Sequence, residues 1–256
     1  MGVCGLIKLE KTDVYGFEAA IRGMRNPMNS WDKSDSDWEF VEDESIINPN
    51  DEVLFVAGEN DLRLMKNLSK AGNDHGKFLR YINVTVDVTC HHTWWAEFDT
   101  YKVGTVRNSC SKMHKIHVKE FVKSDFSTEG IDECGGRTLE VFLFVIDELE
   151  RLRTLFNDTQ DKRYWRAIIE LLPMGYNIKA TVQLNYQVLK SMYHARKNHK
   201  LDEWHEFCDW CESLPYFREV CCYQAGKRSS QEVTQASLLQ GTTGLSVPGR
   251  SGCQSV

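Results

Sequence analysis

The sequence lacks any apolar run long enough to cross a membrane. Although 41% of its 256 residues are hydrophobic, no run approaches the roughly 20 consecutive apolar residues that a membrane-spanning helix needs. Residues 1–13 also lack the apolar core of about 7–15 residues that marks a secretory signal peptide. We therefore expect a soluble, cytoplasmic protein with no membrane partner, in which the nine cysteines are thiols.

An excess of positive charge is also missing. The formal net charge is -6 at pH 7, and the sequence pI is about 5.8. Because affinity for DNA or RNA depends on neutralising many phosphates, this composition argues against binding of a nucleic-acid polymer. A local basic pocket for a single nucleotide is still compatible with it.

The familiar catalytic motifs are absent as well. The sequence contains no G-x-S-x-G, no P-loop, no G-x-G-x-x-G and no H-E-x-x-H. An enzyme built from this chain would therefore depend on a cofactor that carries out the difficult chemical step, while the protein orients and polarises the reactants.

One group of cysteines resembles a set of zinc ligands. Cys208 and Cys211 lie three residues apart, with His205 before them and Cys221-Cys222 after them. The alternative is that these thiols sit in the core, because Cys208 and Cys211 fall on an apparent helix beside aromatic residues. The spacing favours core thiols, and we expect no metal site.

Periodicity predicts an α+β protein in which a mixed or antiparallel sheet is flanked by long helices. Residues 78–89 alternate between apolar and polar side chains, which is typical of a half-buried strand. Apolar residues at helical spacing predict helices over 14–24, 62–71, 138–156, 163–172, 178–196 and 201–214. Residues 94–101 fit either a helix or a strand. Helices that gather in the second half, after a strand in the first, indicate segregated layers.

The composition changes after Tyr223. Residues 224–256 are rich in Ser, Gln, Gly and Thr and contain no aromatic residue. Such a segment buries too little apolar surface to offset the entropy of ordering it. The sequence therefore predicts one domain over 1–223 and a disordered tail over 224–256.

Two polar residues interrupt an apolar stripe in 171–204. In a helix over 178–196, Asn185 and Arg196 share one face with Val182, Leu189 and Met192. An unpaired buried amide costs on the order of 1–3 kcal/mol, and an unpaired charge costs more. A ligand is one possible partner for both groups. The alternative is that Asn185 caps a neighbouring turn and Arg196 complements the helix dipole at the C-terminal end.

The same segment resembles a helix of the flavin-dependent thymidylate synthases. Leu172-Pro173, Asn185, Arg196, His199 and Trp204 follow the order of that family's LP…N-x-R…R…H-x-x-W pattern. In the family, the Asn and the first Arg lie near the flavin, and the second Arg holds the nucleotide. Here N-x-R has become Asn185-Tyr186-Gln187, and the interval from His199 to Trp204 differs from the family's.

The family's stronger signature, R-H-R followed by seven residues and a Ser, is degraded in this chain. The equivalent positions are Tyr101-Lys102-Val103, seven residues, and Ser111. The spacing survives but the arginines do not, and a Lys offers a point charge where Arg offers a planar fork. The chain thus resembles a divergent branch of the family.

The resemblance implies a function. It implies reductive methylation of dUMP to dTMP with FAD as cofactor, methylenetetrahydrofolate and NADPH as co-substrates, and a homo-oligomer, by resemblance a tetramer. The nucleotide-binding residues that it implies are Arg196, Lys102 and Ser111, of which Ser111 is also the catalytic candidate. The residues that it implies for the cofactor are Asn185, Gln187, His75 and His199.

Two other functions are compatible with the sequence. The missing R-H-R arginines also fit a nucleotide or flavin binder that has lost methyl transfer. A helical interaction protein, in which Asn185 and Arg196 are structural, is the third possibility.

Overall fold

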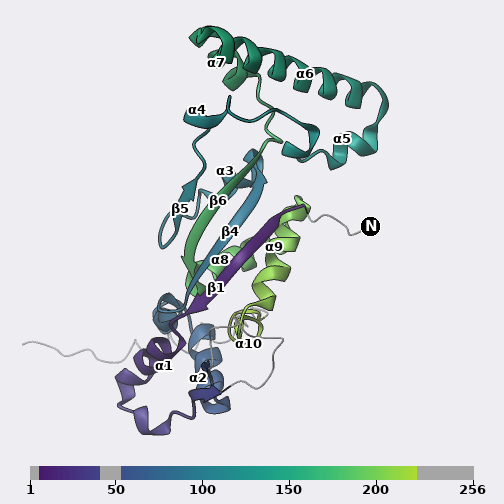
Figure 1. Ribbon diagram of the computed structural model, residues 1–256. Helices are drawn as coiled ribbons and strands as arrows, with labels where there is room; N and C mark the ends of the chain where they lie inside the picture. The colour runs from purple at the N-terminus through teal and green to yellow at the C-terminus, as the bar shows by residue number, and fades with distance from the viewer. Residues whose placement is uncertain (1–5, 41–52, 224–256) are drawn as a thin grey trace, which may run out of the picture. The chain divides into compact units, whose positions relative to one another are not determined.

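The computed structural model describes residues 6–40 and 53–223 (Figure 1). The predicted tail, 224–256, lies outside the described residues, so the proposed domain boundary stays a prediction. The described part is a mixture of helices and antiparallel sheet, which confirms the predicted fold class. Within that part, no helix combines the length and the apolar character needed to cross a membrane.

The main sheet has four antiparallel strands in the order β1-β4-β6-β5. Their bounds are Lys8–Tyr15 for β1, Asn83–His91 for β4, Asn177–Asn185 for β6 and Val106–Ser109 for β5. A separate two-stranded sheet pairs β2 (Asp37–Phe40) with β3 (Val53–Val56). The two central strands, β4 and β6, contribute buried apolar side chains to the larger hydrophobic core.

Alternation in β4 and β6 divides the sheet into an apolar and a polar face. Val86 of β4 pairs with Val182 of β6, and both side chains are buried. On the other face, Asp87 accepts a hydrogen bond from Thr181 (Oγ1 to Oδ1, 2.6 Å) and pairs with Lys179 at 3.2 Å. Only one face therefore offers a surface for helices to cover.

Ten α-helices are present in the described residues. They are α1 (Phe17–Arg25), α2 (Glu59–Lys70), α3 (His92–Phe98), α4 (Lys112–Lys115), α5 (Glu129–Cys134), α6 (Gly136–Thr159), α7 (Lys162–Leu171), α8 (Tyr186–Arg196), α9 (Asp202–Ser213) and α10 (Phe217–Cys221). Short 3-10 helices also occur, at Asn26–Met28, Trp31–Lys33, Gly76–Arg80 (η3) and Lys123–Asp125.

Two apolar clusters hold these elements together. The larger one joins the apolar sheet face to α3, α8 and α9, with Trp94, Leu189, Met192 and Trp204 fully buried. The smaller cluster packs α6 against α7 around Leu149 and Ile168. In Figure 1, α6 and α7 run alongside each other, and α8 and α9 lie on the sheet.

The predicted helix over 178–196 is wrong in its first half. Residues 177–185 form strand β6, and the helix begins only at Tyr186. Ile178, Ala180, Val182 and Leu184 are buried and alternate with exposed polar residues. This period of two is the strand signal, and an i, i+3 series that starts at Val182 masks it.

Other boundaries also differ from the sequence predictions. The first predicted helix, 14–24, begins only at Phe17, because residues 8–15 form β1. The predicted strand 78–89 begins at Asn83, after η3. Residues 94–101, which fitted helix or strand, lie mostly in α3. The other predicted helices are confirmed to within about three residues, which is the usual uncertainty of helix ends.

Candidate functional site

The junction between β6 and α8 forms one wall of the main candidate pocket. Asn185 ends β6 and caps α8, with its Oδ1 accepting a hydrogen bond from the backbone N–H of Val188 at 3.1 Å. Such a cap satisfies one of the free N–H groups in the first helical turn. The capping role that the sequence left open for Asn185 is therefore present.

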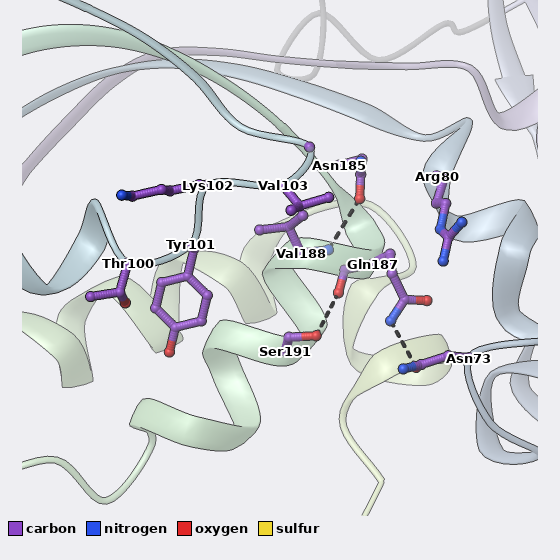
Figure 2. Close-up of a pocket in the computed structure, with 11 residues that line it drawn as sticks. Asn73, Arg80, Thr100, Tyr101, Lys102, Val103, Asn185, Gln187, Val188 and Ser191 are labelled. Carbon is purple, nitrogen blue, oxygen red and sulfur yellow. Dashed lines mark hydrogen bonds between the residues drawn. The ribbon is translucent and has the colours of Figure 1, made fainter.

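The pocket has a volume of about 420 Å³. This volume lies in the range of roughly 300–1,000 Å³ that is typical of small-molecule sites. Three segments line it, namely the region from α2 to η3, the loop after α3, and the first turns of α8 (Figure 2). The lining residues are Asn73, Arg80, Thr100, Tyr101, Lys102, Val103, Gly104, Asn185, Gln187, Val188 and Ser191.

Gly104 lets the loop after α3 approach α8 closely. Its φ is +78°, in the region that favours glycine. A Cβ at this position would lie 3.0 Å from Nδ2 of Asn185 and 3.2 Å from Cγ2 of Val188. The loop can lie this close to α8 because Gly104 has no side chain.

Two cations of the pocket have no partner of opposite charge in the part of the chain that the structure describes. Within residues 6–40 and 53–223, no carboxylate lies within ion-pair distance of Arg80 or Lys102. Figure 2 shows Arg80 pointing toward Gln187, whereas Lys102 extends along the loop. The pocket therefore presents positive charge in a chain whose net charge is -6.

Gln187 leaves one polar atom of the pocket unsatisfied. Its Nε2 donates to Oδ1 of Asn73 at 3.1 Å, and its backbone carbonyl accepts from Oγ of Ser191 at 3.0 Å. Its Oε1 is buried and has no hydrogen-bond partner among the described residues. A buried acceptor without a partner costs about 1–3 kcal/mol, so a donor from a ligand or from water would stabilise it.

Arg196 lies outside this pocket, in a half-buried cluster around Glu97. Its Nη1 donates to Oε2 of Glu97 at 2.8 Å, and its Nε donates to the hydroxyl of Tyr101 at 3.1 Å. The same Glu97 oxygen accepts from Nε1 of Trp204 at 2.9 Å and lies 3.2 Å from Nε2 of His199. Arg196 and His199 thus share one internal carboxylate.

Asn185 and Arg196, for which the sequence offered a ligand as a shared partner, lie in different surroundings. Asn185 lines the pocket and Arg196 does not, because the pocket lies at the N-terminal end of α8 and Arg196 is the last residue of that helix. Tyr101 is the link between them, since it lines the pocket and its hydroxyl accepts from Arg196.

Neither Ser111 nor His75 lines the main pocket. Ser111 precedes α4 and lines a smaller cavity of about 70 Å³ near the start of β6. His75 is exposed at the start of η3. The pocket therefore brings together Lys102, Asn185 and Gln187 from the predicted set, and leaves Ser111, His75, Arg196 and His199 elsewhere.

Sequence reasoning missed several residues of the pocket. Arg80 and Asn73 lie about a hundred residues before α8, and no motif connects them to it. Ser191 had a usable signal, because it lies one helical turn after Gln187. The zinc hypothesis finds no support within the described residues, where no three His, Cys, Asp or Glu side chains are grouped to hold a metal ion.

Comparison with known proteins gives a likeness in fold. No protein-family model and no curated protein matches this sequence. Two solved structures of thymidylate synthase X from Helicobacter pylori, a flavin-dependent thymidylate synthase complexed with FAD and dUMP, each superimpose with a TM-score of 0.58. Each match covers 84% of this chain and 97% of the other, at 14% sequence identity. This likeness shows that the chain shares their fold.

Proposed function

We propose that this chain is a flavin-nucleotide-binding protein of the thymidylate synthase X fold, with the Arg80–Lys102–Gln187 pocket as part of its FAD site. The observation that carries the proposal is one pocket with two cations and a buried acceptor that have no partner among the residues the structure describes. The solved structures with this fold hold FAD and dUMP, which supports the same ligand class here.

The residues of the pocket fit the chemistry of a flavin nucleotide. Arg80 and Lys102 supply charge for phosphate oxygens, and Arg can bind them with two parallel hydrogen bonds. Val103 and Val188 offer apolar surface beside the amides of Asn185 and Gln187. When bound, FAD supplies the reducing equivalents, so the task of the protein is to bind and orient it.

Removing the two cations is expected to weaken FAD binding by at least about tenfold. A charge-assisted hydrogen bond contributes about 1.5–3 kcal/mol, so the double variant Arg80→Ala/Lys102→Ala should lose more than either single variant. Titration followed by quenching of flavin fluorescence measures the dissociation constant. Lys77→Ala is the matched control, because Lys77 is an exposed cation of the same η3 that does not line the pocket. Equal affinities for the double variant and the control would contradict the proposal.

Reductive methylation of dUMP with methylenetetrahydrofolate and NADPH is the more specific candidate. The shared fold and the contact of Tyr101 with both the pocket and Arg196 favour it. The pairing of Arg196 with Glu97 favours binding without methyl transfer. Tritium release from dUMP labelled at carbon 5 separates the two functions. Release that needs all three reactants would establish the synthase, and release no higher than that of heat-treated protein would leave the binding function.

A further inference from the structure

A second group of polar side chains lies at the opposite end of β6 from the main pocket. It surrounds the small cavity near residues 177–179, whereas the main pocket begins at Asn185. At about 3.3 Å per residue, the two sites are roughly 20 Å apart along the strand. The group is therefore separate from the proposed flavin site.

Lys112 and His92 are in direct contact in this group. Nζ of Lys112 lies 2.6 Å from Nε2 of His92 and 3.3 Å from Nδ1. Among the described residues, Lys112 has no carboxylate partner within ion-pair distance. The amine is thus held by an imidazole and not by an anion.

The surroundings of this pair disfavour positive charge. Burial, followed by the positive charge of Arg107, lowers the pKa of Lys112. Burial, followed by the charges of Lys112 and Arg107, lowers the pKa of His92 to about 4. His92 is therefore neutral at pH 7 and can accept an N–H of Lys112.

Among the described residues, the other charged groups near the cavity supply no negative charge to balance that of a protonated Lys112. Arg107 is paired with Asp99 at 2.6 Å, and Lys179, which lines the cavity, is paired with Asp87 at 3.2 Å. Lys115 is exposed and, like Lys112, lines the cavity. Burial raises the pKa of Tyr176, which also lines the cavity, so its phenol stays neutral.

We propose that Lys112 is a reactive amine that forms an imine with small aldehydes or ketones, and that His92 is its positioning residue. Enzymes activate lysines in this way, by removing them from water or by placing them next to another cation. The cavity, about 70 Å³ in volume, suits a carbonyl compound of few carbon atoms.

The reaction balances without an oxidant or a reductant. The nitrogen lone pair of neutral Lys112 attacks the carbonyl carbon, a C–N bond forms, and the C=O electron pair moves to oxygen. The nitrogen then loses a proton to solvent, and the oxygen gains one. Protonated again, the hydroxyl leaves as water while the nitrogen lone pair forms the C=N bond, and the protonated imine then loses its N–H proton to solvent. His92 holds the amine by accepting one of its hydrogens until the last N–H proton is lost.

Reductive trapping tests this proposal. The full-length protein is incubated with acetaldehyde and cyanoborohydride at pH 7, and the rate of alkylation of each lysine is followed by peptide mass spectrometry. We expect Lys112 to react at least about fivefold faster than Lys115, because more of its amine is unprotonated at this pH. Lys115 is a suitable internal control, since it lies on the same α4 and lines the same cavity.

A variant of His92 tests the positioning role. His92→Gln replaces the ring by a flexible amide, and we expect the rate at Lys112 to fall toward that at Lys115 and the pH profile of labelling to change. Circular dichroism checks that the variant is folded. Equal rates at Lys112 and Lys115 in the unmodified protein would overturn the proposal. An unchanged pH profile in a folded His92→Gln protein would remove His92 from it.

Discussion

Replacing Glu97 with glutamine is expected to raise the affinity of the protein for dUMP by at least about tenfold, which corresponds to about 1.4 kcal/mol. In the structure, the Glu97 carboxylate neutralises Arg196 at 2.8 Å and also accepts from Trp204. A glutamine oxygen can still accept one of these hydrogen bonds but carries no charge. The guanidinium of Arg196 would then be free to pair with a phosphate.

Isothermal titration with dUMP measures this gain. The double variant Glu97→Gln/Arg196→Ala is expected to lose it, because the cation that receives the phosphate is then absent. Asp99→Asn is the matched control, since Asp99 lies just after the same α3 and pairs with Arg107, away from Arg196. If folded Glu97→Gln binds dUMP no better than Asp99→Asn does, Arg196 is not a nucleotide ligand and its role is structural.

The segment around Asn185 shows how far the sequence could lead. The stripe drew attention to Asn185 and the family resemblance to Gln187, and both line the pocket, while their role in a site stays a prediction. The predicted start of the helix was wrong. Apolar residues from Val182 to Arg196 recur at helical spacing, although the chain changes from strand β6 to helix α8 after Asn185. Side chains repeat every 2 residues in a strand and about every 3.6 residues in a helix. Applying the helical period to a strand that leads directly into a helix therefore assigns the strand side chains to the wrong faces.

The partners of Arg196 and Gln187 could not be predicted from the sequence. Glu97 lies 99 residues before Arg196, and Asn73 lies 114 residues before Gln187. Such contacts depend on the antiparallel pairing of β4 with β6, which brings α3 and η3 next to α8. Local spacing contains no information about this pairing, whereas the strand alternation in 82–88 was readable because it is local.

Replacing Asp61 with alanine is expected to lower the free energy of unfolding by about 3–5 kcal/mol, the usual cost of removing one partner of a buried ion pair. Asp61 is fully buried in α2 and accepts from Nε of Arg25 at 2.6 Å. It also accepts from the hydroxyls of Ser34 and Ser36, both at 2.6 Å. The variant would leave Arg25 charged, 5% exposed and without its carboxylate.

Urea denaturation followed by circular dichroism measures this loss. Glu18→Ala is the control, because Glu18 forms an exposed i, i+4 pair with Arg22 on α1, and exposed pairs contribute little. The double variant Arg25→Met/Asp61→Leu replaces both charged side chains by apolar ones and so distinguishes loss of the ion pair from burial of an unpaired charge. We expect it to be more stable than Asp61→Ala, because no unpaired charge is then buried. A similar denaturation midpoint for Asp61→Ala and Glu18→Ala would show that the ion pair does not hold α2 in place.

Since α2 leads into Asn73 and η3, loss of the Arg25–Asp61 pair should also weaken FAD binding at the Arg80 side of the pocket.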